Sequence, residues 1–178
     1  MKPALIYHVA ASLDGYIARP DGALDWLRDV EAAADEHGHA AFYASIDGLL
    51  MGRATYGRVR DDGDWPYPGK PSLVLARNPL ENAPAGIQGR HCTPAEALEE
   101  LAACGCERVW LVGGGSLAGN CLAAGLLDEL VVDLIPHLLG AGIPLFATAL
   151  ERRLQLHGQR SFASGLVQLH YRVLPEAI

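Results

Sequence analysis

The sequence has little basic charge, little cysteine and no long apolar run. Lys2 and Lys70 are its only lysines, and 21 acidic against 14 basic residues give a formal net charge of −7. Nucleic-acid binding needs a clustered basic surface, so we expect no nucleic-acid partner. No stretch approaches the roughly 20 apolar residues that span a bilayer, which predicts no membrane partner.

The small number of cysteines argues against a zinc-binding protein and against a disulfide-stabilised one. Cys92, Cys104, Cys106 and Cys121 lack the paired spacing of a zinc site, and a chain of 178 residues needs no disulfide framework. We therefore expect reduced thiols, no metal and a cytoplasmic protein. The N-terminal segment is interrupted by Asp14 and alternates like a strand, which does not fit a signal peptide.

Apolar residues, by contrast, make up 50% of the sequence, enough to bury one core. No repeat, low-complexity tract or long linker divides the chain, so we predict a single domain over residues 1–178. Short apolar, partly β-branched runs predict strands over residues 4–11, 48–51, 72–76, 108–112, 129–135, 152–162 and 166–174.

Helical patterns lie between these strands, over residues 31–46, from 52 onward, 94–104 and 116–124. Thr93, Pro94 and Glu96 have the pattern of a capping box with proline at the first helical position. Alternating strands and helices predict parallel crossovers, and the last two strands, joined at residues 163–165, predict an antiparallel hairpin. The expected fold is therefore α/β with a mostly parallel mixed sheet.

Three consecutive glycines follow one of these strands. Gly113, Gly114 and Gly115 come after Val112, and a helix is expected from Ser116. This order places free backbone N–H groups and the positive end of a helix dipole at the carboxyl edge of the sheet, where an anion binds. The absent Cβ atoms give a pyrophosphate room, and Ser116 can cap the helix. The alternative is a tight turn without a ligand, since the Rossmann and Walker spacings are absent.

A second strand end repeats this arrangement. Gly52 follows Met51, and Arg53 and Thr55 start a helix. A third strand end supplies Arg77. Two arginines could flank a phosphate that lies apart from the pyrophosphate, as in a 2′-phosphorylated adenine dinucleotide. For each arginine alone, a solvated surface charge is an equal alternative.

Four stretches taken together resemble a known family. SLDGYIA, LLMGRATYG, SLVLARNP and LVGGGSLAGNCLAAGLLDELVVDLIPHLLGAGIPLF occur in this order and cover nearly the whole chain. The combination resembles the dihydrofolate reductase fold family, and within it the branch of the reductase domain of bifunctional riboflavin-biosynthesis enzymes and small stand-alone relatives. The resemblance implies a three-layer fold with helices on both faces of the sheet. It also implies an NADPH-dependent reductase with a small-molecule substrate.

The resemblance further implies that the cofactor lies across the carboxyl ends of the strands. Carried over by motif, the pyrophosphate site comprises Gly113, Gly114, Gly115, Ser116, Leu117 and Ala118. The 2′-phosphate and adenosine side comprises Gly52, Arg53, Ala54, Thr55, Ala76 and Arg77. The nicotinamide is bordered by Ala10, Ala11, Asp14, Ile17 and Trp26. A simple turn role for Asp14 and a plain packing role for Trp26 are the alternatives.

Hydride transfer is carried by the cofactor, so the protein has to position a C=N or C=O bond and supply a proton. Dihydrofolate reductases bind the pterin through a carboxylate on their first helix, and Asp35 or Glu36 stands at the corresponding distance before the MGR motif. Asp133 interrupts an apolar strand, which predicts that it lines a cavity or meets a partner. These three are the candidate catalytic residues. A solvated helix acid and a satisfied structural acid are the alternatives.

Two departures from the family leave the substrate open. Riboflavin-type reductase domains carry a substrate-binding glutamate just ahead of the glycine loop, where this chain has Val112. Dihydrofolate reductases have a proline-tryptophan step where this chain has Asp25 and Trp26. We expect a small heterocyclic substrate, pterin- or pyrimidine-like, or a carbonyl compound. Authentic dihydrofolate reductase activity and a dinucleotide-binding module without catalysis are the alternatives, and the apolar terminal strands and family habit predict a homodimer.

Overall fold

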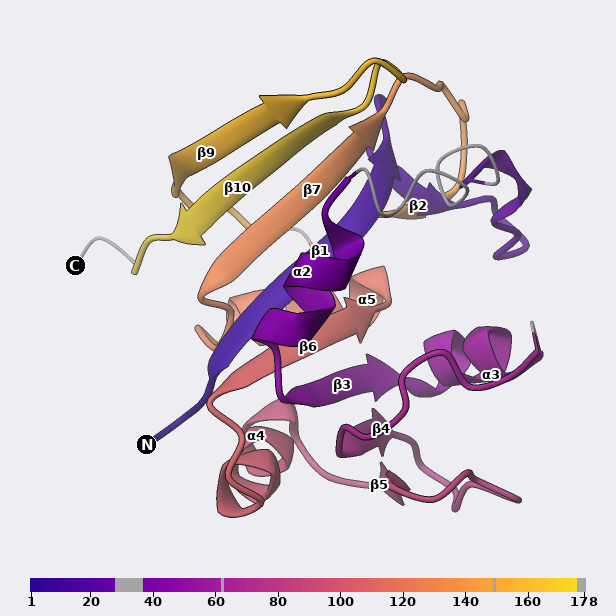
Figure 1. Cartoon of the computed structure of the whole chain (residues 1–178), viewed down its shortest axis with the longest axis vertical. Helices are drawn as coiled ribbons and strands as arrows, with labels where there is room; N and C mark the ends of the chain where they lie inside the picture. The colour runs from indigo at the N-terminus through magenta and orange to yellow at the C-terminus, as the bar shows by residue number, and fades with distance from the viewer. Residues whose placement is uncertain (28–36, 62, 149, 176–178) are drawn as a thin grey trace.

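A computed structural model describes residues 1–27, 37–61, 63–148 and 150–175. Its main sheet contains β1 (Ala4–Ser12), β3 (Gly48–Gly52), β4 (Ser72–Leu75), β5 (Ile87–Arg90), β6 (Arg108–Gly113), β7 (Glu129–Ile135), β9 (Leu154–Ser161) and β10 (Val167–Val173). The eight strands are ordered β5-β4-β3-β6-β1-β7-β10-β9 (Figure 1). The six strands from β5 to β7 pair in parallel.

The chain closes with an antiparallel hairpin, as predicted. Strand β10 pairs antiparallel with both β7 and β9. At the turn, the Gly165 N–H donates a 2.9 Å hydrogen bond to the Phe162 carbonyl oxygen, and Gly165 has a φ of 85°, which glycine adopts readily. The prediction of a mostly parallel mixed sheet with a terminal hairpin is therefore confirmed.

Helices cover both faces of the sheet, which confirms the predicted three layers. The helices are α2 (His39–Ser45), α3 (Arg53–Asp61), α4 (Pro94–Ala103) and α5 (Gly115–Ala123), with a 3₁₀ turn η1 (Asp25–Leu27). On one face, Leu98 of α4 and Leu122 of α5 are buried with Leu5 of β1. On the other, Tyr56 of α3 is buried with Ile6 of β1, and α2 packs there through half-buried aromatic side chains. The sheet lies between the two cores.

Helix α4 begins as its sequence predicts. The Thr93 side chain accepts a hydrogen bond from the Glu96 N–H, and the Glu96 carboxylate accepts one of 2.8 Å from the Thr93 N–H. Pro94 occupies the first turn. Helix α2 differs from its prediction, which covered residues 31–46. Within the described part of that range it starts only at His39, because Gly38 is left-handed with a φ of 82°.

Three short strands have no counterpart in the predictions. Strands β2 (Tyr16–Ala18) and β8 (Ile143–Pro144) form a small second sheet, and β5 lies in a segment expected to be a loop. Strand β5 has one buried apolar side chain, Ile87, and lies at the edge of the main sheet. A single apolar residue gives no periodicity, so only tertiary pairing defines such a strand.

Candidate functional site

The carboxyl ends of β3 and β6 lie next to each other, and each leads into a helix. Met51 is in register with Gly113, so the starts of α3 and α5 adjoin. A Cβ built on Gly52 would lie 3.7 Å from the Gly113 carbonyl oxygen. A Cβ on Gly113 would lie 3.6 Å from Thr55 Oγ1, and a Cβ on Gly114 would lie 3.5 Å from the same atom. The structure thus brings the two predicted helix starts together around a space that side chains would fill.

Helix α5 begins without a side-chain cap. Its N-cap residue is Gly114, with extended backbone angles of φ −97° and ψ −168°, and no side chain hydrogen-bonds to the cap. The prediction that Ser116 caps this helix is wrong, because the helix begins at Gly115 and Ser116 lies inside its first turn. The first N–H groups of a helix have no carbonyl partner within it, so this start offers free donors and the positive end of the dipole.

Gly115 has a structural reason to be glycine as well. A Cβ at this position would overlap the Pro144 carbonyl oxygen, and the Ala147 N–H donates a 3.1 Å hydrogen bond to the Gly115 carbonyl oxygen. One turn further along, a Cβ at Gly119 would overlap Thr148 Oγ1. The segment from residue 144 to 148 therefore packs directly on the backbone of α5.

Leu117 and Ala118 face the core beneath α5, where both are buried. If they contribute to a ligand site, they do so through the main chain. Ser116, by contrast, is exposed on the first turn of the helix. The predicted pyrophosphate site therefore consists of glycines, backbone N–H groups and one exposed hydroxyl, a set of groups that suits an anion.

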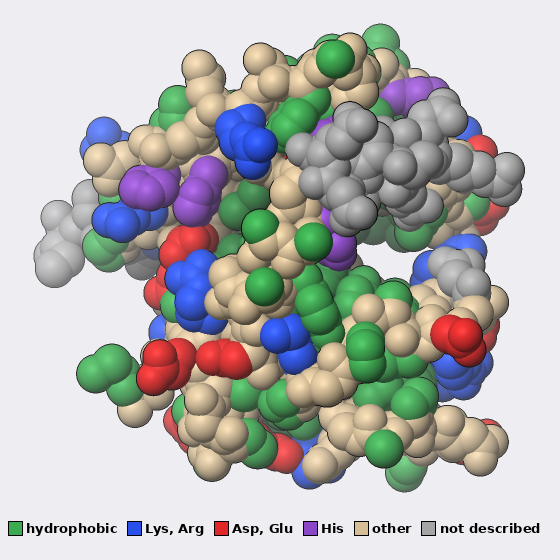
Figure 2. Space-filling view, viewed as in Figure 1, with side chains coloured by type: hydrophobic (Ala, Val, Ile, Leu, Met, Phe, Trp, Pro, Cys, Tyr) green, Lys and Arg blue, Asp and Glu red, His purple; other side chains and the backbone are tan. Residues whose placement is uncertain are grey.

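The two predicted arginines lie at this edge of the sheet, Arg53 exposed and Arg77 at the end of a strand. The Arg53 guanidinium carbon lies 5.6 Å from the ring centroid of Tyr56, which is buried. Arg77 comes two residues after the end of β4, preceded by the half-buried Ala76, and Ala54 is exposed on α3. Figure 2 shows the surface hollowed beside the region that carries α3. The arginines are thus available to a ligand from solvent.

Asp14 joins the loop after β1 to the loop after β7. Its carboxylate accepts hydrogen bonds from Ser12 Oγ at 2.6 Å, the Leu139 N–H at 3.1 Å and the Gly140 N–H at 2.7 Å. These hydrogen bonds, that of Ser12 first, lower the pKa of Asp14 to about 2. The geometry gives Asp14 a role in shaping the loops, because its oxygens are already engaged.

The other residues predicted to border the nicotinamide divide between the two faces of the sheet. Ala11 and Ile17 pack with the core beneath α5, whereas Ala10 packs in a cluster with Trp26 on the opposite face. This cluster also contains Ile135 at the end of β7. The Trp26 Nε1 atom is buried and has no hydrogen-bond partner among the described residues. Trp26 therefore packs in the apolar cluster at this strand end.

Asp133 lies on the same face as Ala10, with which it is in register. Its Oδ2 lies 2.9 Å from Nε2 of His8, and its Oδ1 accepts a 2.8 Å hydrogen bond from Gln168 Nε2. The expectation that Asp133 meets a partner in this strand is confirmed, its catalytic role stays a prediction, and the partner residues were missed. His8 interrupts the apolar strand β1 just as Asp133 interrupts β7, and this shared pattern of a polar residue within an apolar strand could have revealed the pair.

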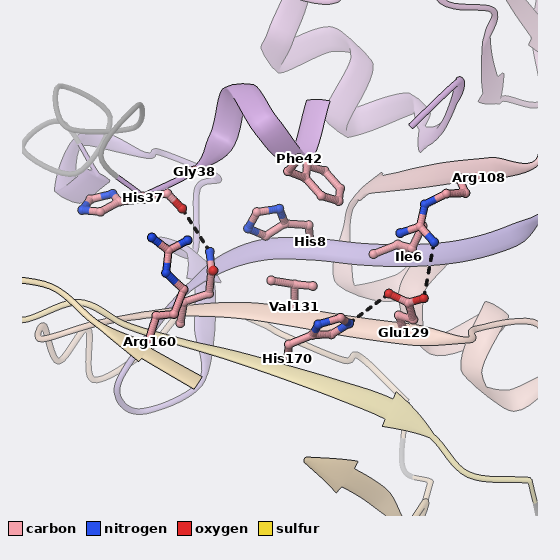
Figure 3. A pocket seen from close by; sticks show the side chains of 11 residues that line it. Ile6, His8, His37, Gly38, Phe42, Arg108, Glu129, Val131, Arg160 and His170 are labelled. Carbon is pink, nitrogen blue, oxygen red and sulfur yellow. Dashed lines mark hydrogen bonds and ion pairs between the residues drawn. The ribbon is translucent and has the colours of Figure 1, made fainter. Parts of the chain in front are cut away.

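A cavity of about 170 Å³ opens beside His8, between α2 and the strands β1, β7 and β10 (Figure 3). Ile6, Phe42 and Val131 supply apolar walls. His37, Arg160 and Gln168 also line it, and in Figure 3 the Arg160 guanidinium lies beside Gly38. The ring centroids of His8 and Phe42 are 4.4 Å apart in an edge-to-face arrangement. This volume suits one small ring system rather than a dinucleotide.

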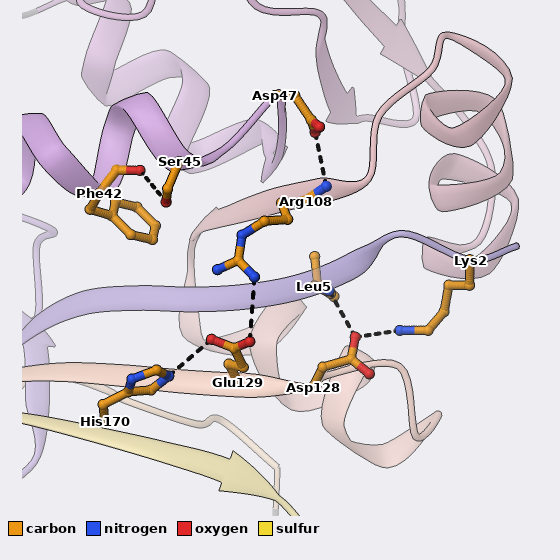
Figure 4. A network of polar contacts seen from close by, with 9 residues as sticks. All are labelled: Lys2, Leu5, Phe42, Ser45, Asp47, Arg108, Asp128, Glu129 and His170. Carbon is orange, nitrogen blue, oxygen red and sulfur yellow. Dashed lines mark hydrogen bonds and ion pairs between the residues drawn. The ribbon is translucent and has the colours of Figure 1, made fainter. Parts of the chain in front are cut away.

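The far end of this cavity is occupied by structural ion pairs (Figure 4). Glu129 lies 3.6 Å from Arg108 Nη1 and 2.9 Å from His170 Nε2. The Arg108 N–H donates a 2.9 Å hydrogen bond to Asp47. These contacts join β6, β7 and β10 at the amino end of β7, so the charges there are used within the protein.

Further predictions concern the two acids of the first helix, the cysteines, a metal site and a membrane span. The candidate catalytic residues Asp35 and Glu36 lie outside the described residues. Burial raises the pKa of Cys106 to about 11 and that of Cys121 to about 12, so both thiols stay protonated near neutral pH. Among the described residues, no three His, Cys, Asp or Glu side chains gather as a metal site would require, and no helix there is long and apolar enough to cross a membrane.

Known proteins resemble this chain over nearly its whole length. YwjB, an uncharacterized protein of Bacillus subtilis (strain 168), is 32% identical over 177 residues, 96% of this chain and 98% of YwjB. A crystal structure from Shewanella sp. PV-4, described as a riboflavin biosynthesis protein, has a TM-score of 0.82 at 32% identity and covers 97% of this chain and 99% of its own.

A more distant structure shows the same fold. Dihydrofolate reductase from Enterococcus faecalis, complexed with NADP(H), has a TM-score of 0.67 at 18% identity over 97% of this chain and 98% of the reductase. The sequence profile of the RibD C-terminal domain matches residues 3–168. The chain therefore belongs to the family of RibD C-terminal domains, a reductase-like family with the fold of dihydrofolate reductase.

Proposed function

We propose that this protein is an NADPH-dependent reductase that transfers a hydride to a small heterocyclic or carbonyl substrate. The observation that carries the proposal is the pair of helix starts at the carboxyl ends of β3 and β6, with Gly52, Gly113 and Gly114 between them. Gly113 and Gly114 have no Cβ atom, and a Cβ at either position would occupy the space next to Thr55. A phosphate can therefore approach the main chain there.

The residues present fit this dinucleotide. The uncapped start of α5 would hold the pyrophosphate through its backbone N–H groups, with the exposed Ser116 hydroxyl beside it. Arg53 and Arg77 would hold the 2′-phosphate, since the guanidinium fork matches phosphate oxygens. When bound, the reduced nicotinamide supplies the hydride. The Ala10 and Trp26 cluster would exclude water from that end of the site.

The relatives support a reductase but leave the substrate open. The enterococcal reductase with this fold is complexed with NADP(H), and the Shewanella relative is described as a riboflavin biosynthesis protein. The substrate-binding glutamate of riboflavin-type domains is replaced by Val112 here. We therefore propose a planar heterocycle or carbonyl compound other than the riboflavin intermediate. A cytoplasmic setting fits the free state of Cys92, Cys104, Cys106 and Cys121.

A thermal-shift titration with NADPH, NADH, FMN and dihydrofolate tests the cofactor, because ligands that bind the native state raise its Tm. We expect NADPH to raise the Tm at lower concentration than NADH does, and FMN to leave it unchanged. A stronger effect of FMN than of NADPH would contradict the proposal.

An NADPH-oxidation assay with dihydrofolate and with a panel of pyrimidines, pterins and carbonyl compounds then tests turnover. We expect oxidation with at least one member of the panel. Turnover of dihydrofolate that an antifolate inhibits would identify a dihydrofolate reductase. NADPH binding without turnover of any compound would identify a dinucleotide-binding module and overturn the catalytic claim.

A further inference from the structure

The strongest unassigned feature is a buried histidine with one ring nitrogen unpaired. His8 is 7% exposed and lines the cavity beneath α2. Its Nε2 is paired with Asp133, and Asp133 is held in turn by Gln168. Its Nδ1 is buried and has no hydrogen-bond partner among the described residues. A buried polar atom without a partner costs free energy, so such an atom in a residue that lines a cavity points to a ligand.

The hydrogen bonds of Asp133 relate the tautomer of His8 to the charge of the carboxylate. When the Asp133 carboxylate is ionised it only accepts hydrogen bonds, and the His8 atom that faces its Oδ2 is then a protonated Nε2. The other oxygen of Asp133 is occupied by Gln168. In the neutral imidazole Nδ1 then carries a lone pair and is an acceptor. The complementary group on a ligand is an N–H donor.

The position of His8 relates this atom to the proposed hydride-transfer site. His8 and Ala10 lie on the same face of β1, one side-chain repeat apart, which is about 7 Å along a strand. Ala10 packs in the cluster of Trp26, whose Nε1 also lacks a partner among the described residues. A planar ring system between Ile6, Phe42 and Val131 could therefore reach toward Ala10 while its edge meets His8.

We propose that His8 determines substrate specificity by accepting a hydrogen bond at Nδ1 from a ring N–H of a planar heterocycle. Asp133 and Gln168 are positioning residues that set the tautomer of His8. The assignment of this heterocycle as the substrate rests on the proposed reductase function. The hydrogen-bond preference itself does not, because it follows from the contacts of His8 and Asp133 in the protein without cofactor.

Replacing Asp133 with asparagine should invert the preference. The carbonyl oxygen of the introduced amide would accept from Gln168, and its NH₂ group would face His8 Nε2. His8 would then keep its proton on Nδ1, which becomes a donor and selects a ligand with a lone pair. A role of Asp133 in stability alone predicts a loss of binding to every ligand and no such inversion.

Indole and quinoline are suitable probes because both are planar and bicyclic, yet indole offers only an N–H and quinoline only a lone pair. We would titrate each at pH 8.5 into cofactor-free protein labelled with ¹⁵N in histidine. The ring ¹⁵N resonances of His8 report protonation of each nitrogen. We expect a protonated Nε2, and indole to bind at least about fivefold more tightly than quinoline and to shift Nδ1. In Asp133→Asn the preference reverses.

His8→Phe keeps a ring of similar size without Nδ1, and it should abolish the discrimination between the two probes. His91→Phe, at an exposed position, is the matched control and should preserve it. The Tm of each variant shows that it is folded. Equal binding of both probes to the wild-type protein, or a protonated Nδ1 in it, would overturn the proposal.

The two proposals can fail separately. Discrimination between the probes without any NADPH binding would leave the His8 assignment intact and remove the reductase function. NADPH binding with turnover, but without discrimination between the probes, would support the reductase function and remove the His8 assignment.

Discussion

Arg53 and Arg77 stand at the same edge of the sheet as the glycines that precede and begin α5. NADPH differs from NADH only in its 2′-phosphate. We therefore expect Arg53→Ala and Arg77→Ala each to weaken NADPH binding about tenfold and to leave NADH binding nearly unchanged. Isothermal titration of both nucleotides measures this.

Arg172→Ala is the matched control for these variants. Arg172 is also exposed, but it is in register with Glu129 at the amino end of β7. Arg53 and Arg77, by contrast, follow the carboxyl ends of strands. Its removal should change neither affinity. An equal loss of NADPH and NADH binding in the Arg53 and Arg77 variants would mean that the arginines do not recognise the 2′-phosphate.

The pH dependence of stability tests whether the charge of Asp14 holds the loops after β1 and β7 together. Its pKa is lowered to about 2 in the folded protein, so the carboxylate stabilises the fold above its ordinary pKa of about 4, and this contribution is lost as the pH falls toward 2. Asp14→Asn should therefore lower the Tm at pH 7, and the gap to the wild-type protein should narrow between pH 4 and pH 2. A gap that is constant over this range would contradict the role of the charge.

The site residues differ in how far the sequence reveals them. The glycines and Asp133 stand out because each breaks a local pattern at a strand or within one, and Thr55 stands out because it lies at the helix start that follows β3. His8 breaks the pattern of β1 in the same way, but its meaning depends on the register that places it near Asp133. Gln168 lies 35 residues from Asp133, and nothing in its local sequence indicates that the two meet.

At the scale of elements, α5 is held by the close approach of the segment from residue 144 to 148. A Cβ at Gly115 would overlap the Pro144 carbonyl oxygen, so Gly115→Ala should destabilise the protein by about 1–3 kcal/mol. Gly158→Ala on β9 is the control, because a Cβ there meets nothing within 4 Å. Urea unfolding measures both, and equal stabilities of the two variants would show that the contact is unimportant.

The starts of α4 and α5 give opposite expectations for two hydroxyl residues. Thr93 caps α4, and Thr93→Ala should cost about 1 kcal/mol of unfolding free energy. Ser116 lies inside the first turn of α5 and makes no cap, so Ser116→Ala should cost almost nothing. Urea unfolding measures both variants. A larger loss of unfolding free energy in Ser116→Ala than in Thr93→Ala would contradict these assignments.

The elements were predictable to the extent that their own residues define them. Strands β3, β4 and β6 have continuous apolar runs, β1 and β7 have apolar runs with one polar residue inside each, and α4 has a complete capping box. Strands β2, β5 and β8 have two to four residues each, and pairing with distant segments defines them. The segment of residues 144 to 148 could not be placed on α5 from sequence, because the need for glycine at position 115 appears only once the two backbones are seen together.

At the scale of the whole molecule, strand β9 ends the sheet with apolar side chains in solvent. Leu154 is 39% exposed and Leu156 is 51% exposed, and within the described part of the chain β9 pairs only with β10. An unpaired edge strand with apolar side chains favours pairing with another chain. We propose that a second copy of this chain covers β9, which would make the protein a homodimer.

Sedimentation equilibrium tests the homodimer. We expect the mass of two chains for the wild-type protein and of one chain for Leu156→Arg. Gln155→Arg, whose side chain alternates to the opposite face of β9, is the control and should remain dimeric. A wild-type mass of one chain would exclude the homodimer.

A crystal structure of the protein with NADPH tests the central claim most directly. The predicted result is a pyrophosphate within hydrogen-bond distance of backbone N–H groups in the first turn of α5, with the 2′-phosphate between Arg53 and Arg77. A dinucleotide bound elsewhere, or a helix start that stays empty at saturating NADPH, would contradict it.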